Sequence, residues 1–169
     1  SHAHGDHHGA LMKIIDKKEW YSRIYVDGIY FMEPTKDFIE TTTYDAYTDM
    51  WTLARSYVLF EASDGGQCKY YRPQFGQRYY FCDMSIDVTL TMDQFEEWYA
   101  VDFNDSSTWL MHNIEGQKFL HAGDAAETGC KVAMDMFDKE YFELDMFSVL
   151  HHGINVYNYF TDYCKIKTL

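Results

Sequence analysis

The first nine residues, Ser1–Gly9, contain four histidines and an aspartate, and no other stretch restricts the possible folds as strongly. His2 and His4 are two residues apart, so their side chains point to the same side of an extended segment. Asp6 continues this alternation, and His7 turns the other way. Imidazole nitrogens and carboxylate oxygens suit zinc, manganese or iron. The stretch therefore predicts two imidazoles on one metal ion, with Asp6 and His7 on a second ion beside it.

A purification tag or a solvated polar start is the other interpretation of a histidine-rich beginning. Tags are usually uniform histidine runs, whereas here the histidines alternate with other residues. Two later segments carry the same ligand chemistry and favour the metal interpretation. Gly123-Asp124 combines a residue that lets the backbone come close to an ion with a carboxylate that can offer one oxygen to each of two cations. His151-His152-Gly153 ends an apolar run.

In this order and spacing, the three segments resemble the signature of the metallo-β-lactamase superfamily. The opening is similar to its His-x-His-x-Asp-His motif, Gly123-Asp124 to its bridging aspartate, and His151-His152-Gly153 to its last ligand motif. The chain most resembles the branch found in the soluble domain of ComEC-type DNA-uptake proteins, where an Asn-x-Ser-Ser run precedes a hairpin, as residues 104–107 do here. The resemblance covers nearly the whole chain and is thin between about Ile24 and Asp102.

The resemblance implies an α/β (α+β) fold, namely a four-layer αββα sandwich made of two similar halves. We therefore expect a single metallo-β-lactamase-like domain over residues 1–169. The first strands of that family precede the histidine motif, so the resemblance also implies that this domain lacks the first strands of its N-terminal half.

The resemblance also implies a dinuclear site that holds two divalent ions, zinc first and manganese as the alternative. Asp124 bridges the two ions. His152 binds the second ion, and His151 either replaces it or orients it. The family's third imidazole on the first ion is missing at 104–107, and His112 and His121 are substitutes by proximity alone. The implied ligands are His2, His4, Asp6, His7, Asp124, His151 and His152.

The implied chemistry is metal-assisted hydrolysis, in which a hydroxide held between the cations attacks phosphorus or a carbonyl carbon. Asp124 and Asp6 are the expected catalytic carboxylates, with Asp6 orienting the nucleophile. The expected substrate is a phosphodiester in a small phosphoester or at a nucleic-acid end. Two alternatives stay open: a hydrolase of small esters, lactones or thioesters, and a non-catalytic metal-binding domain of the same fold.

Charge and composition restrict the partners. The formal net charge of −13 argues against a broad nucleic-acid surface. No apolar run is long enough to predict a membrane segment. Four scattered cysteines without a Cys-x-x-Cys pair favour buried thiols and a reducing, cytoplasmic compartment. Arg72 and Arg78 are candidates for contact with an anionic substrate, although exposed strand charges are the commoner explanation. The oligomeric state stays open.

Hydrophobic periodicity and turn residues predict the order of the elements. We expect helices over 9–23, 41–60, 127–137 and 156–164, strands over 24–32 and 144–150, a β-rich segment over 69–91 with a loop at 72–77, and a hairpin that pairs 108–114 with 118–120.

Overall fold

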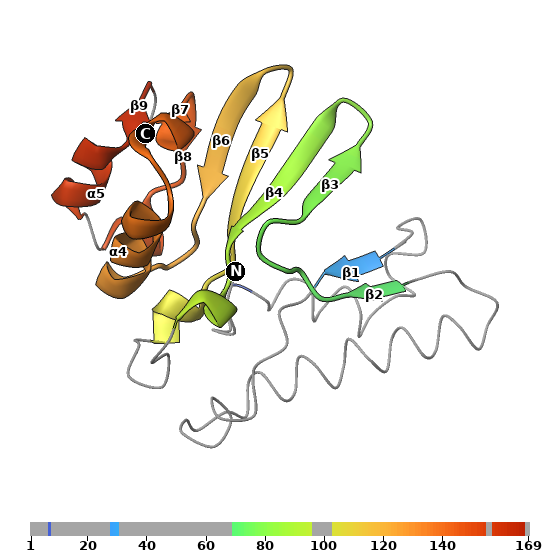
Figure 1. Cartoon of the computed structure of the whole chain (residues 1–169), viewed down its shortest axis with the longest axis horizontal. Helices are drawn as coiled ribbons and strands as arrows, with labels where there is room; N and C mark the ends of the chain where they lie inside the picture. Colours follow the sequence, from blue (N-terminus) through green and yellow to red (C-terminus); the bar gives the residue numbers. More distant parts are fainter. Residues whose placement is uncertain (1–6, 8–27, 31–68, 96–102, 155–156, 168–169) are drawn as a thin grey trace. The chain divides into compact units, whose positions relative to one another are not determined.

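The computed structural model describes residues 7, 28–30, 69–95, 103–154 and 157–167 (Figure 1). The helices expected over 9–23 and 41–60 lie outside these residues. Contacts divide the chain into two compact units, one of Ala3–Pro73 and the other of Gln74–Leu169 together with Ser1–His2. In the first unit, strand β1 (Gly28–Tyr30) pairs in parallel with β2 (Lys69–Tyr71).

The second unit is built around a five-stranded sheet with the order β3-β4-β5-β6-β8. The first four strands are antiparallel to their neighbours, and β8 lies parallel to β6. Helices α4 and α5 follow in the sequence, and the short strands β7 and β9 pair with each other in parallel. This part of the chain is therefore α+β, as expected. The bounds are β3 Arg78–Phe81, β4 Met84–Leu90, β5 Trp109–Ile114, β6 Gln117–His121, α4 Glu127–Met136, β7 Glu143–Leu144, β8 Met146–Phe147, α5 Asn158–Tyr163 and β9 Lys165–Ile166.

The predicted hairpin is confirmed as β5 and β6. Its turn holds Glu115 at φ 49° and Gly116 at φ 81°, and two successive left-handed residues match the right-handed twist of the strands. The β-rich segment is confirmed as β2, β3 and β4, with the expected loop before β3. The helix predicted over 127–137 is confirmed as α4.

One face of the sheet forms the hydrophobic core. Leu90, Trp109, Met111 and Leu120 are 0–1% exposed on β4, β5 and β6. Helix α4 and helix α5 add apolar side chains to the same cluster, among them Cys130, Ala133 and Phe160. The rings of Trp109 and Phe160 meet edge to face with centroids 5.4 Å apart. The core therefore fixes the start of α4 against the ends of β5 and β6.

The opposite face carries a row of cross-strand partners. It runs from Tyr79 through Ile86, His112 and Phe119 to Met146, one residue from each strand of the sheet. The first four residues are half-buried and Met146 is exposed. The sheet is therefore apolar on both faces at its middle.

The single strand predicted over 144–150 is wrong. The segment divides into β7 and β8, which belong to different sheets, and a 3-10 turn occupies Leu150–Gly153. Asp145 stands at the division, where its carboxylate accepts hydrogen bonds from the backbone N–H of Lys118 and from the Lys167 ammonium. A buried strand has no place for a side chain with such partners. The helix predicted over 156–164 is found as α5, which ends at Tyr163 with Cys164 as its C-terminal capping residue.

Candidate metal centre

Asp124 lies in the turn that joins β6 to α4, two residues before the first capping position of the helix, Ala126. Its preceding residue, Gly123, has φ 60°, a left-handed conformation that glycine adopts without steric cost. Asp124 is 2% exposed. The turn therefore directs an acidic side chain into the protein, where an unpaired carboxylate would be unfavourable.

The segment His151-His152-Gly153 forms a second unusual turn. All three residues are left-handed, with φ of 48°, 53° and 85°. For the two histidines this conformation costs about 1–2 kcal/mol each. The N–H of His151 donates a hydrogen bond to the carbonyl oxygen of Gly123, with an N···O distance of 3.2 Å. This bond joins the histidine turn directly to the aspartate turn.

Both imidazoles converge on Asp124. The Nε2 atom of His152 lies 3.5 Å from the Oδ2 atom of Asp124, and the Nε2 atom of His151 lies 3.8 Å from the same oxygen. The His152 side chain is 52% exposed and the Asp124 side chain 3%. The cluster therefore has a buried carboxylate at its base and a solvent-facing imidazole at its rim.

Two residues of the segment 104–107, to which the sequence assigned no individual role, support the aspartate turn. Oδ1 of Asp105 accepts hydrogen bonds from the backbone N–H groups of Ala126 and Gly129, each at 2.8 Å. Ala126 has no side-chain cap of its own, so Asp105 caps the start of α4 from a distance. The Ser107 hydroxyl accepts a hydrogen bond from the Asp124 N–H at 3.2 Å.

Both supports belong to the segment 104–107, in which the resemblance led us to look for a missing metal ligand. Asp105 and Ser107 are 1% and 0% exposed. Their burial next to a turn was not visible in the sequence. The signal that was present is the run of three side chains able to cap a helix, Asp105, Ser106 and Ser107, ahead of a strand that returns to a helix start.

Gly129 is required where Asp105 approaches α4. A Cβ atom at this position would lie 2.8 Å from Asp105 Oδ1, closer than side-chain carbons approach other atoms. The helix therefore has a glycine in its first turn for reasons of space, although glycine weakens helices.

The other predicted ligands are placed as follows. His2, His4 and Asp6 lie outside the described residues. His7 is helical and half-buried and belongs to the unit of residues 3–73, whereas Asp124, His151 and His152 belong to the other unit.

The two substitutes for the missing third imidazole lie on the hairpin. The ring of His112 stacks on Phe119 with centroids 5.5 Å apart, and burial lowers the pKa of this imidazole. His112 therefore has the structural role expected for a histidine on a hairpin face. His121 is half-buried at the end of β6, where it pairs with Leu110.

The residues around Asp124 fit a divalent cation. The Nε2 atoms of two imidazoles lie within 4 Å of one carboxylate oxygen. Zinc and manganese accept imidazole and carboxylate ligands. A buried carboxylate beside imidazoles is also an ordinary ion pair, so the arrangement alone does not require a metal.

Among the residues that the structure describes, no helix is both long and apolar enough to cross a bilayer. No protein-family model matches the chain, and no curated protein sequence matches it significantly.

Proposed function

We propose that the chain is a divalent-metal-dependent hydrolase that acts on phosphodiester bonds. The observation that supports this proposal is the convergence of His151 and His152 on the buried carboxylate of Asp124. The resemblance of the three ligand segments supplies the reaction class. Strain in two successive left-handed histidines also favours a functional role, because such strain concentrates at active sites.

Each residue has a distinct part in this proposal. Asp124 and His152 would hold a cation, with His151 as the alternative ligand or as the residue that orients His152. His2, His4, Asp6 and His7 complete the set proposed from the sequence. A divalent cation held by these residues would lower the pKa of a water molecule toward neutrality and so would supply a nucleophile. The exposed side of His152 is where a substrate would arrive.

The proposed fold is an αββα sandwich, to which the five-stranded sheet with α4 and α5 would contribute one half. Helices α4 and α5 add to the core on one face of the five-stranded sheet, and the row from Tyr79 to Met146 runs along the other. A second sheet packed on that row would give the inner layers of a sandwich. With a net charge of −13, the substrate is proposed to be small or a nucleic-acid end rather than a long duplex.

The test uses the 169-residue chain after removal of any affinity tag. Metal content is measured by mass spectrometry after dialysis against zinc or manganese, and turnover is measured with bis-p-nitrophenyl phosphate. We expect about two metal ions per chain and turnover that Asp124→Asn abolishes. Asp135→Asn is the matched control, because Asp135 is an exposed aspartate on α4. It should keep both metal and turnover.

The remaining outcomes separate the alternatives. Metal binding without turnover of any ester would identify a non-catalytic metal-binding domain. Turnover of lactones or thioesters but not of phosphodiesters would instead identify a hydrolase of small esters, lactones or thioesters. A chain that binds neither ion would refute the proposal.

A further inference from the structure

A cavity of about 460 Å³ opens between the β3–β4 hairpin and the end of α4. It lies apart from the candidate metal centre. Phe137, which follows the last residue of α4, lines the cavity, whereas Asp124 precedes the first residue of the same helix. The ten residues of α4 span about 15 Å. Volumes of this size are typical of sites for small molecules.

One side of the cavity is aromatic. Phe137 stacks on Tyr141 with ring centroids 4.3 Å apart and an interplanar angle of 21°. Phe75 approaches Phe137 from the loop before β3, with centroids 6.1 Å apart. Gly76, the next lining residue, has no side chain to narrow the space. These rings offer flat apolar surface, and planar aromatic groups pack favourably against such surface.

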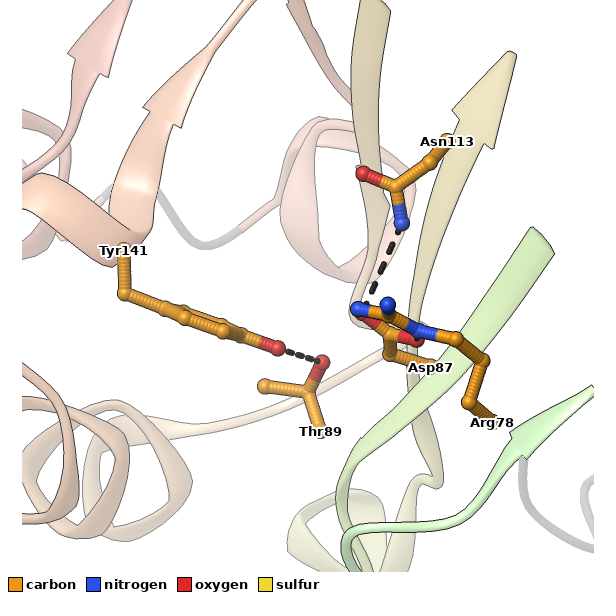
Figure 2. Close-up of polar contacts among 5 residues, drawn as sticks. All are labelled: Arg78, Asp87, Thr89, Asn113 and Tyr141. Carbon is orange, nitrogen blue, oxygen red and sulfur yellow. Dashed lines mark hydrogen bonds and ion pairs between the residues drawn. The ribbon is translucent and has the colours of Figure 1, made fainter. Parts of the chain in front are cut away.

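The ring of Tyr141 is held in position from the sheet. Its hydroxyl shares a hydrogen bond with the Thr89 hydroxyl at 3.0 Å, and Figure 2 shows the ring extending toward β4 to reach it. Thr89 sits at the register shift between Val88 and Leu90. Burial raises the pKa of Tyr141, so the phenol stays neutral at physiological pH. The wall is therefore preorganised and uncharged.

The opposite edge carries a planar ion pair. Arg78 donates to Asp87 through Nε and through Nη2, the latter at 2.7 Å. Asn113 donates to the same carboxylate from β5 at 3.4 Å (Figure 2). Both carboxylate oxygens of Asp87 thus accept hydrogen bonds already, whereas a guanidinium has five N–H groups and Asp87 engages two. The Tyr80 side chain also hydrogen-bonds to Arg78, and the guanidinium still has donors left over for a ligand.

The residues that line the cavity carry no net charge, although the protein as a whole is strongly acidic. Among the residues that line the cavity, Asp87 is the one carboxylate, and Arg78 neutralises it. The ammonium of Lys118 lies 5.8 Å from the centroid of the Tyr141 ring and adds a second cation beside the aromatic wall. A ligand that supplies acceptors and negative charge therefore fits, and a cationic ligand does not.

We propose that this cavity binds a small planar aromatic ring that carries an anionic group. The ring lies against Phe137 and Phe75, and the anion accepts hydrogen bonds from Arg78. The shared chemistry has two natural sources, an aromatic carboxylic acid and a nucleotide, and the experiment distinguishes them. This site does not depend on the proposed hydrolase activity, because it lies at the other end of α4.

The test measures binding to the full chain by ligand-observed nuclear magnetic resonance and calorimetry, with 2-naphthoate and adenosine monophosphate as probes. The controls are 2-naphthalenemethanol, which keeps the ring without the charge, and cyclohexanecarboxylate, which keeps the charge without the flat ring. We expect one or both probes to bind at least tenfold more tightly than either control, since a charge-assisted hydrogen bond contributes about that factor. Tighter binding of 2-naphthoate assigns an aryl acid, and tighter binding of the nucleotide assigns a nucleotide.

Two variants test the role of the ion pair. Arg78→Gln should weaken binding about tenfold. Asp87→Asn should strengthen it about threefold, because the amide oxygen still accepts from Arg78 while the competing negative charge is removed. Thermal melts check that both variants fold. Equal binding of a control and its probe, no binding of either probe, or equal weakening by the two variants would each overturn the proposal.

Discussion

The Oδ1 atom of Asp105 lies 2.8 Å from the backbone nitrogen of Gly129, in the first turn of the helix that follows Asp124. The two residues are far apart in the chain, and each explains the other. The carboxylate satisfies N–H groups that every helix start leaves unpaired. The glycine leaves room for the carboxylate to approach.

Gly129→Ala should therefore lower the free energy of unfolding by about 1–3 kcal/mol, because the new Cβ pushes Asp105 away from two N–H groups. In an Asp105→Ala background the same substitution should instead stabilise the protein by about 0.5–1 kcal/mol, since alanine favours helices over glycine. Urea titration of the four proteins measures both effects. Thr128→Ala, an exposed neighbour, is the control. A stabilising Gly129→Ala in the unsubstituted protein would contradict the close contact.

Ser107→Ala should weaken metal binding more than it weakens the fold. The Ser107 hydroxyl accepts a hydrogen bond from the Asp124 N–H. Removing a group that holds a metal ligand in place lowers metal affinity about tenfold or more. The expected loss of stability is about 1 kcal/mol. Competition with a chromogenic zinc chelator measures affinity, and a thermal melt measures stability. Ser148→Ala, a half-buried serine on the same unit, should leave zinc affinity unchanged.

Zinc should stabilise the protein through His152. At a concentration one hundred times its Kd, a ligand that binds the native state alone adds about 2.7 kcal/mol to the free energy of unfolding. His152→Ala should remove most of this increment, and His151→Ala less, because the His151 imidazole is the more distant from Asp124. His112→Phe should retain the full increase in the free energy of unfolding on zinc binding. A zinc effect that survives in His152→Ala would transfer the ligand role to His151.

The acid sensitivity of the protein should depend in part on His112. Burial lowers the pKa of this imidazole below its ordinary 6.5, so the unfolded chain takes up the proton first as the pH falls. Its contribution to stability is intact above about pH 6.5 and is lost as the pH falls through the lower pKa of the folded state. His112→Phe keeps the stacking on Phe119 without the titration. Its melting temperature should drop less between pH 7 and pH 5 than that of the unsubstituted protein.

Thiol reactivity should follow burial. Cys130 is 0% exposed and Cys164 6%, and burial raises the pKa of the Cys130 thiol and takes that of Cys164 to about 12. Cys82 is exposed in the turn between β3 and β4. In a Cys68→Ser variant, Ellman's reagent should titrate Cys82 quickly at pH 8 and the other two thiols after unfolding. Rapid reaction of all three would mean that the core around α4 opens readily.

The elements that the sequence predicted correctly are those with local causes. The β5–β6 hairpin follows from a turn with Gly116 between two apolar runs, and α4 follows from helical spacing after Asp124. The strand predicted over 144–150 was wrong because of contacts with residues that are distant in the sequence. Its apolar pattern is local, but Asp145 is held by Lys118 and Lys167, which pairing within the segment does not reveal.

In the candidate site, too, some features follow from the local sequence and others depend on the tertiary structure. Asp124 and the two histidines are recognisable as ligands by residue type, and the structure brings these three together. The supporting roles of Asp105 and Ser107 depend on which turns meet in the folded chain. The hydrogen bonds from Ala126 and Gly129 to Asp105, and the one from Asp124 to Ser107, form only in the tertiary structure.

Helix α4 fixes the spacing between two contacts, one near its start and one just after its end. Its first turn must place Gly129 next to Asp105, and the residue that follows its last turn, Phe137, must stack on Tyr141. One residue inserted in the helix would rotate Phe137 relative to Gly129 by about 100° and move it about 1.5 Å along the helix axis. Homologous chains should therefore vary in length at the hairpin tips and keep the number of residues between these two positions constant.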